Sequence, residues 1–467
     1  MDSIKKVKSY EQHLKDIKAI SEQIRNSKGK IALKRDSSCC SRSFEYKKGK
    51  ILIDISMLNQ VIEINIEDNF IIVEPLITME ELADATLFYG MIPPVITEFK
   101  HMTLGGAIQG LGGESSSFKY GLIDDSVIEY ELILGDGSVI TINREQNLDL
   151  FNALPGSYGS LGVVTKIKLR LINAAKYVRI QYKKVNNIDE VYKVFENSIK
   201  QINNLDFIEC IAVAKDDFRI AMGYKTNSMS YGDWLFNSCS LKHSFSPWYY
   251  CHLLDKSNQS NAYEYIPFKD YLFRWDRGAF WTGLKFKHTL FNRIKYGRHL
   301  ECKNLYKHFY AKELIQRDKN SMLQDLGVPI SSMNEFFYLI DNLTHIYPLW
   351  LIPIISPKSA KLFSLPVNID YAFVDFGIWG PLTNPQGFLE VNRKFEEYLY
   401  HHNGRKCFWG QCFCSRDEFW KIYDKRLYNK LRSQYYAEDK FINIYDKVSE
   451  LYQQIERLPS SQDENVT

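Results

Sequence analysis

A run of 21 residues, HMTLGGAIQGLGGESSSFKYG from His101 to Gly121, carries six glycines. Glycine weakens regular elements, so this density indicates a main chain that turns tightly or admits a close neighbour. In glycine-rich turns of this kind, free main-chain N–H groups most often bind a phosphate. The run lacks the Walker spacing and follows no clear hydrophobic strand, so its near match to a dinucleotide fingerprint is not specific. From these residues alone, tight-turn packing explains the glycines equally well.

The length of 467 residues predicts two or three domains. Hydrophobic residues make up 45% of the chain and charged residues 25%, as in globular proteins. A net charge of +3, with acidic and basic residues interleaved, argues against a nucleic-acid partner. Aromatic residues reach 14%, which suits either a site for a large apolar ligand or an aromatic core.

Nine cysteines occur without the paired spacings or nearby histidines of structural zinc sites, so we expect no metal and reduced thiols in the cytoplasm. The first 30 residues are charged and helix-prone, and they lack a secretory signal. The longest apolar run, Tyr347 to Ser356, is about half a membrane span. We therefore expect no transmembrane segment, while peripheral contact with a membrane stays open.

Several local patterns predict elements of the first 175 residues. Two β-type runs, ILIDI and NFIIVEP, flank what reads as a polar link. Thr78 and Glu81 form a capping box that starts a helix through about Tyr89. The sequence Gly135-Asp136-Gly137 between two apolar runs predicts a β-hairpin. Alternation along residues 161–171 predicts a strand with one buried face.

We predict three parts, each assigned from its pattern of strands and helices, and an α+β fold class. Residues 1–175 form one α+β domain, and residues 176–400 form a second domain of sheet and helices. Residues 401–467 form a C-terminal segment that returns to the first domain and ends in a disordered tail. In that segment a capping box at Ser415 and Glu418 precedes an apolar helical stripe from Phe419 to Leu431.

An ordered set of motifs resembles the flavin-binding half of the vanillyl-alcohol oxidase, or PCMH-type, FAD flavoproteins. The set comprises the T-x-G-G turn at Thr103, then the following glycines, the hairpin, and the glycine turn at residues 156–162. The resemblance implies a two-subdomain FAD-binding domain. It also implies the cofactor-binding residues Thr103, Gly105, Gly106, Gly110, Gly112, Gly113, Ser115, Ser116, Gly121, Gly156, Gly159 and Gly162.

Further segments are similar to the eukaryotic sterol side-chain reductases, which saturate the C24–C25 double bond. They include VEPLITMEELADA, GGESSSFKYGLIDD, HIYPLWLIP and CSRDEFWKIYDKRLYNKLR, and the similarity spans roughly residues 45 to 450. The resemblance implies an FAD-dependent oxidoreductase with NADPH as reductant, a sterol or similar apolar substrate, and residues 176–400 as a substrate-binding cap. Proteins with many different reactions share the flavin-binding half, so the similarity of the second half says more about the substrate and the reaction.

Three departures from that family pattern stand out. The segment LKRDSSCCSRS (residues 33–43) has no flavin-linking histidine, so we expect non-covalent FAD and an altered loop from Lys34 to Arg42. Phe118 replaces a histidine of the family. The N-terminal anchor of the animal members is missing, so we expect a cytoplasmic protein, with peripheral attachment to the endoplasmic reticulum as the alternative.

Reduction of an isolated alkene requires a proton as well as a hydride. We expect protonation at C24 and hydride transfer from the flavin to C25. Glu114, Lys119 and Tyr120 are the candidate catalytic residues, because they lie in the stretch that should border the flavin ring. Alternatively, these three side chains cap turns or form ion pairs on the surface. Asp276 with Arg277, and the segment Gln411-Cys412-Phe413, are weaker candidates, and Phe413 replaces a frequent tyrosine.

Many aromatic residues of the second half could wall an apolar pocket, or they could form the domain core. They are Trp248, Tyr249, Tyr265, Phe273, Trp275, Phe280, Trp281, Trp350 and Trp379.

Two other functions remain open at this point. An oxidase or dehydrogenase of an alcohol or polyol on the same fold would need a polar pocket and rapid reoxidation in air. A flavin-less scaffold is the other alternative, and the altered loop motivates it.

Overall fold

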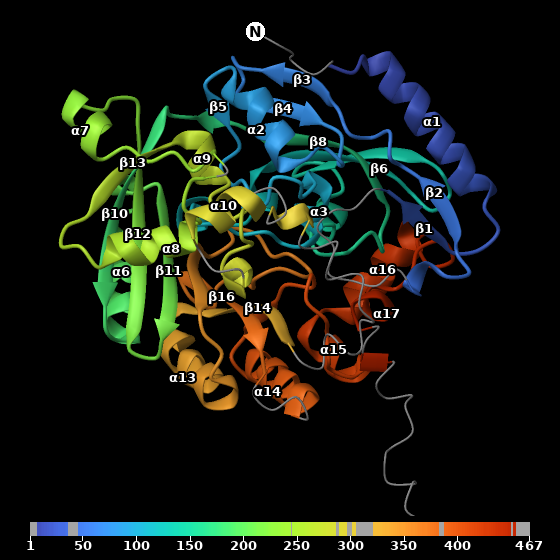
Figure 1. The fold of residues 1–467 in the computed structure, drawn as a ribbon. Coiled ribbons are helices and arrows are strands. Elements are labelled where there is room, and N and C mark those ends of the chain that lie inside the picture. Colours follow the sequence, from blue (N-terminus) through green and yellow to red (C-terminus); the bar gives the residue numbers. More distant parts are fainter. Residues whose placement is uncertain are drawn as a thin grey trace, which may run out of the picture.

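The computed structural model describes residues 7–35, 45–243, 245–285, 289–296, 301–304, 321–382, 387–449 and 452–453. A five-stranded and an eight-stranded sheet dominate the molecule, and helix α3 (Leu104–Gln109) of the glycine-rich segment lies between them (Figure 1). This mixture confirms the predicted α+β class. Within the described residues, no helix combines the length and apolar character needed to cross a bilayer.

The five-stranded sheet is antiparallel throughout and has the order β3-β4-β8-β6-β7. Its strands are β3 (Val61–Asn65), β4 (Phe70–Val73), β6 (Val127–Ile133), β7 (Val139–Asn143) and β8 (Val163–Arg170). Buried and half-buried side chains alternate along β8, which confirms the strand predicted over residues 161–171. The segment that reads as a polar link contains β3, in which Glu63, Ile64 and Asn65 pair with successive residues of β4.

Local signals placed two further elements correctly. In the predicted hairpin, Ile133 of β6 pairs with Val139 of β7, and Gly137 has a φ of +82° that favours glycine. Helix α2 (Met79–Leu87) begins at Thr78, whose side chain and that of Glu81 complete the capping box. Short elements around this sheet are α4 (Ser117–Tyr120), α5 (Leu148–Ala153), β5 (Met91–Ile92), β9 (Ile172–Asn173) and η2 (Ile123–Ser126).

The eight-stranded sheet has the order β13-β10-β12-β11-β15-β16-β14-β17, and its neighbouring strands are antiparallel. Its strands are β10 (Tyr177–Val185), β11 (Phe207–Ala214), β12 (Asp217–Thr226), β13 (Tyr263–Pro267), β14 (Ser321–Pro329), β15 (Leu349–Ile355), β16 (Ala372–Pro381) and β17 (Arg405–Lys406). The predicted border near residue 175 therefore falls between β9 and the first strand of this sheet.

One face of the large sheet packs on three helices, α6 (Ile188–Lys200), α13 (Met333–Thr344) and α14 (Phe388–His401). Their buried side chains share one apolar cluster with sheet residues such as Ile208, Ile220 and Phe376. The other face turns toward the five-stranded sheet. Smaller elements of this half are η3 (Ile202–Asn204), α7 (Tyr231–Phe236), α8 (Tyr249–Ser257), α9 (Phe268–Leu272), η4 (Thr282–Lys285), α10 (Leu290–Tyr296) and η5 (Ile330–Ser332).

The last part of the chain contacts both sheets. Strand β17 ends the large sheet, whereas the main chain of Lys440 accepts a hydrogen bond from Ile31 N at 2.8 Å. The predicted apolar stripe is divided between two helices, because Tyr423 is extended and Asp424 caps the second one. The helices are α15 (Arg416–Ile422), α16 (Lys425–Gln434) and α17 (Ile444–Val448). Helix α16 lies beside the parallel pair of β1 (Ile31–Lys34) and β2 (Ile51–Asp54) (Figure 1). The short helix η1 (Glu45–Lys47) precedes β2.

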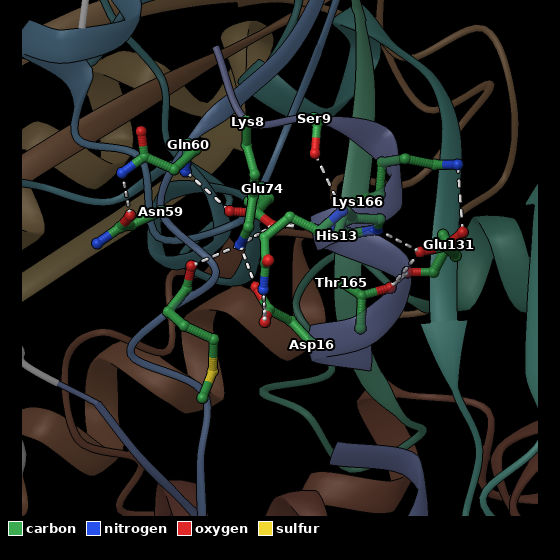
Figure 2. Close-up of polar contacts among 12 residues, drawn as sticks. Lys8, Ser9, His13, Asp16, Asn59, Gln60, Glu74, Glu131, Thr165 and Lys166 are labelled. Carbon is green, nitrogen blue, oxygen red and sulfur yellow. Dashed lines mark hydrogen bonds and ion pairs between the residues drawn. The ribbon is translucent and has the colours of Figure 1, made fainter. Parts of the chain in front are cut away.

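The N-terminal helix α1 (Tyr10–Asn26) joins the first domain through a buried histidine. Nδ1 of His13 lies 2.8 Å from Glu74 Oε1, and Nε2 lies 3.0 Å from Glu131 Oε1 (Figure 2). Lys8 contacts Glu74 at 2.7 Å, and Lys166 contacts Glu131 at 3.2 Å. Both ring nitrogens face carboxylates, so the ring donates to both only when it is protonated.

The pKa values of this cluster follow from those contacts. Burial opposes the charged form of His13, but the hydrogen bonds to Glu131 and Glu74 outweigh it and raise the pKa of His13 above 6.5. Burial also opposes the charge on Glu131, yet His13, Lys166 and Thr165 lower the pKa of Glu131 to about 2. The sequence gives no sign of this cluster beyond a helix-prone segment, because His13 and Glu131 are 118 residues apart.

We predict that His13→Gln destabilises the docked α1 by about 3–5 kcal/mol, because it removes the one buried cation that Glu74 and Glu131 share and leaves each carboxylate with a lysine alone. Limited proteolysis of α1 and the melting temperature measure the effect.

In the wild type, the stabilisation by His13 is complete below pH 6.5 and is lost as the pH rises through the raised pKa. The stabilisation by Glu131 is present above its ordinary pKa and is lost as the pH falls toward about 2.

Lys15→Gln is the matched control, because Lys15 is on the same helix and makes an exposed ion pair with Glu11. Such pairs contribute only about 0.3–0.5 kcal/mol. Equal sensitivity of α1 to protease in the His13 and Lys15 variants would contradict the assigned role of His13.

Candidate active site

A cavity of about 560 Å³ lies between the glycine-rich segment and the inner face of the large sheet. Its volume falls in the range of about 300–1,000 Å³ that is usual for ligand sites. The wall has three sources: the first domain, strands β14 to β16 with the segment from Ala279 to Thr282, and the C-terminal residues Arg405 to Cys407 with Trp409 and Lys447.

Strand register explains which side chains of the large sheet reach the cavity. Asp325 of β14 is opposite Gly377 of β16, and Gly327 is opposite Asp375. Because opposite residues share a face, both aspartates project from the same side of the sheet, diagonal to each other. Both of them line the cavity. A Cβ at Gly377 would lie 3.2 Å from Asp325 Oδ1, so the missing side chain leaves room for the carboxyl group.

Three carboxyl groups meet this cavity: Glu98, Asp325 and Asp375, which are at most 9% exposed. Trp409 Nε1 donates to Asp325 Oδ2 at 2.5 Å, and within the described part of the chain Oδ1 of Asp325 accepts no hydrogen bond. Burial, and next the charge of Asp375, raise the pKa of Asp325 well above its ordinary value. Burial raises the pKa of Asp375 to about 7 and that of Glu98 to about 8. All three can therefore hold protons near neutrality.

Most of the predicted cofactor-binding residues line the same cavity. They are Thr103, Gly105, Gly106, Gly110, Gly112, Gly113, Gly159 and Gly162. The remaining predicted residues, which are Ser115, Ser116, Gly121 and Gly156, are not among the lining residues.

The glycines serve two different needs. A Cβ at Gly112 would lie 2.7 Å from Thr97 Cγ2, so close packing within the protein requires this glycine. At Gly159 only one atom would lie within 4 Å of a Cβ, but φ is +71°, so the turn itself requires glycine. Lys447 Nζ donates to the main-chain oxygen of neighbouring Tyr158 at 2.6 Å and lines the cavity there. Bare main chain beside a cation fits an anionic dinucleotide such as FAD.

Glu114, the first predicted catalytic residue, belongs to a buried ion cluster outside the cavity lining. Its Oε1 lies 2.9 Å from Arg274 Nη2, and Arg274 Nε lies 2.8 Å from Oε1 of Glu209 on β11. The indole N–H groups of Trp275 and Trp350 both donate to Glu209 Oε2 at 2.9 Å. Burial raises the pKa of Glu114, and Arg274 opposes that effect. The cluster fastens the glycine-rich segment to the large sheet.

The other two predicted catalytic residues also lie away from the cavity wall. Lys119 Nζ is 3.2 Å from Asp206 Oδ1, which matches the ion-pair reading of this lysine. Tyr120 is half-buried, and burial raises the pKa of its phenol. Neither side chain is among the lining residues, so neither is placed to protonate a ligand in the cavity.

The predicted aromatic wall separates into two groups. Phe280, Trp281, Trp350 and Trp379 line the cavity. The others, which are Trp248, Tyr249, Tyr265, Phe273 and Trp275, are buried but are not lining residues. Asp276 pairs with the main chain, as its Oδ1 accepts from Lys100 N at 3.0 Å, and Arg277 donates to main-chain oxygens such as that of Leu241.

Positions that depart from the family pattern have different surroundings. Phe118 is fully buried and packs in the cluster beneath the large sheet, and Phe413 is buried in the same cluster. Of the altered loop, residues 36–44 lie outside the described part of the chain, while Arg35 lines the cavity.

Sequence reasoning missed Glu98, Asp325, Asp375, Trp409 and Lys447. The motif DFGIWG around Asp375 reads only as a strand, and no local signal places it beside Asp325, which is 50 positions earlier. A polar residue inside an otherwise apolar strand was the available sign, since an unpaired carboxyl group is costly to bury.

Comparisons with known proteins agree with this geometry. A family model described as an FAD binding domain matches residues 12–143. The delta(24)-sterol reductase of Mus musculus is 30% identical over 412 residues, which cover 86% of this chain and 78% of the relative. That of Homo sapiens is 29% identical over the same shares of the two chains. That of Arabidopsis thaliana is 25% identical over 94% of this chain and 85% of the relative.

These matches extend through the large sheet and the C-terminal segment, well beyond the flavin-binding half. They therefore include the part that lines the cavity on the side away from the glycines. By sequence and by domain content, this chain belongs to the delta(24)-sterol reductase family.

Proposed function

We propose that this protein reduces the C24–C25 double bond of a sterol side chain, with bound FAD as the redox cofactor and NADPH as the reductant. The observation that carries the proposal is one cavity in which a glycine-rich main chain faces apolar walls and buried carboxyl groups. Membership of the delta(24)-sterol reductase family supports the choice of substrate.

In this proposal the lining residues from Thr103 to Gly113, with the turn at Gly159 and Gly162, hold the cofactor. Lys447 lies beside that turn and would balance the charge of the pyrophosphate. Without a histidine in the segment 33–43, the flavin is held non-covalently. When bound, FAD supplies two-electron hydride chemistry.

The remaining wall suits an apolar side chain better than a polyol. Phe280, Trp281, Trp350, Ile354 and Trp379 line it. Phe280 contacts Trp350 and Trp379 with ring centroids 5.0 and 4.4 Å apart, so these rings form one continuous surface. Such a wall excludes water and orients an alkene by contact alone. It disfavours the alternative of an alcohol or polyol oxidase.

We further propose that the protein contacts a lipid surface through α10. Leu290, Phe291 and Ile294 of this helix are at least 55% exposed, while Arg293 and Lys295 add positive charge with no acidic residue in the helix. A basic helix with exposed apolar residues is typical of binding to anionic membranes. The helix follows closely on the segment Ala279 to Thr282, which lines the cavity, so a membrane-dissolved substrate would have a short path.

An anaerobic spectral titration tests the redox proposal. After reconstitution with FAD, we expect NADPH to bleach the flavin absorbance near ~450 nm and a C24-unsaturated sterol such as desmosterol to restore it. Cholesterol, which lacks that double bond, is the matched control and should restore nothing. Product analysis should show the saturated side chain.

Other outcomes of that titration separate the alternatives. A bound flavin that NADPH does not bleach, or that only oxygen reoxidises, would contradict the reductase and favour an oxidase. A protein that stays colourless after incubation with FAD would instead favour the flavin-less scaffold.

Flotation with anionic phospholipid vesicles tests the membrane proposal. We expect the wild type to float and the triple variant Leu290→Ser/Phe291→Ser/Ile294→Ser to remain in solution, because buried apolar area drives such binding. Phe88→Ser is the matched control, since Phe88 is 70% exposed, as is Phe291, but lies at the end of α2. Equal flotation of the wild type and the triple variant would contradict the role of α10.

A further inference from the structure

The reduction proposed above needs a proton donor. None of the three catalytic residues predicted from sequence, Glu114, Lys119 and Tyr120, lines the cavity. The cavity wall offers Asp325 and Asp375, each 8% exposed, on neighbouring strands of the large sheet. They lie on one face and are diagonal in the register, with Gly377 and Gly327 as their opposite partners. Because both opposite residues are glycines, no side chain on the neighbouring strand lies directly beside either carboxyl group.

We propose that Asp325 and Asp375 share one proton and that this carboxyl pair protonates C24 of the substrate. The proposal rests on the proposed function, since it assigns the acid of that reaction.

The surroundings of the pair favour one shared proton. Two carboxylates in a buried site repel each other, so the first ionisation makes the second costly. Trp409 Nε1 donates to Asp325 Oδ2, which stabilises a charge on that group. Lys406 is opposite Leu326, on the other face of the sheet, and its amine pairs with Glu396. Arg405 is opposite Gly327, on the face of the aspartates, and donates to the main-chain oxygen of Gly404. Among the described residues neither cation makes an ion pair with Asp325 or Asp375. The expected state is one carboxylate and one carboxylic acid.

The geometry also leaves an atom free to act. Within the described residues Oδ1 of Asp325 accepts no well-formed hydrogen bond, although the residue is almost fully buried and lines the cavity. The Trp379 indole is close enough to lower the pKa of Asp325, but burial outweighs it. An acid aimed into an apolar space without a partner is costly unless a ligand meets it. The neighbouring rings Trp350 and Trp379, which line the same wall, would hold an alkene close to this oxygen.

The step balances as an overall addition of H⁺ and H⁻. The π electrons of the double bond take the proton from the carboxyl pair and form the new C–H bond at C24. Positive charge then develops on tertiary C25, which accepts a hydride whose two electrons derive from the nicotinamide reductant. The pair, now with both carboxyl groups ionised, regains its proton from water. The adjacent carboxylate charge stabilises the developing cation at C25.

Single isosteric variants test the assignment in separate half-reactions. Asp325→Asn and Asp375→Asn should each slow reoxidation of the reduced flavin by sterol about 10²–10⁴-fold, the usual contribution of a general acid. Asp216→Asn, an exposed position in the hairpin between β11 and β12 of the same sheet, is the control for a lost carboxyl group. Equal rates in the wild type and both cavity variants would overturn the proposal.

Two equilibrium readouts do not depend on turnover. In oxidised protein near pH 7, infrared spectroscopy should detect the carbonyl stretch of a protonated carboxyl group that is lost in Asp325→Asn/Asp375→Asn. A sterol analogue with a protonated amine in place of C25 mimics the cation, and each single variant should bind it at least about tenfold more weakly, as for loss of a buried charged partner. Glu98 can hold a proton of its own near pH 7, so its infrared band does not decide between the groups. Analogue binding that is lost in Glu98→Gln but unchanged in both aspartate variants would move the acid to Glu98 and overturn the proposal.

Failure of this proposal can be told apart from failure of the proposed function. If sterol does not reoxidise the reduced wild-type flavin, the reaction itself is wrong. If sterol reoxidises the wild type and both aspartate variants equally fast, only the assignment of the acid is wrong.

Discussion

The Arg274 guanidinium holds the two halves of the molecule in register. It is fully buried between Glu114, in the glycine-rich segment, and Glu209, in the centre of the large sheet. One cation shared by two buried carboxylates is stable only when all its partners are in place. The indoles of Trp275 and Trp350 complete the set by donating to Glu209. Because Trp350 also lines the cavity, the ion cluster positions one wall of the candidate site directly.

The cavity follows from that arrangement. The glycine-rich segment is held against the inner face of the large sheet, while α6, α13 and α14 cover the outer face. The inner face then presents aromatic rings and the two aspartates toward main chain that carries few side chains. Buried carboxyl groups therefore have two kinds of surroundings in this molecule. Carboxylates that stabilise the fold have cationic partners, as Glu114 and Glu131 do. In the described part of the chain neither cavity aspartate makes an ion pair, and both keep high pKa values.

Local sequence patterns predicted local structure well. The capping boxes at Thr78 and Ser415 and the Gly135–Gly137 hairpin depend on residues within a few positions of each other, and all three are present. The family resemblance, carried by ordered motifs, is confirmed by the comparisons. Most glycines predicted to hold the cofactor line the cavity, although packing against Thr97 accounts for Gly112 within the protein.

Prediction from sequence was weaker wherever distant residues determine the chemistry. The environment of Glu114 depends on Arg274, 160 positions away, and no spacing rule reveals that pair. The same holds for Asp325 and Asp375, whose proximity is a result of β14 and β16 pairing in one register. His13 looked like one more polar residue in a charged helix, because its two carboxylate partners belong to different strands of the first domain.

The most direct test of the central claim is where hydrogen from solvent enters the product. Reduction of desmosterol in D₂O with ordinary NADPH, followed by NMR of the product, reads out the two carbons separately. If a cavity carboxyl group in exchange with water protonates the alkene, C24 carries deuterium. Deuterium at C25 with protium at C24 would mean that the acid acts on the other carbon, and it would contradict the account of how this cavity reduces its substrate.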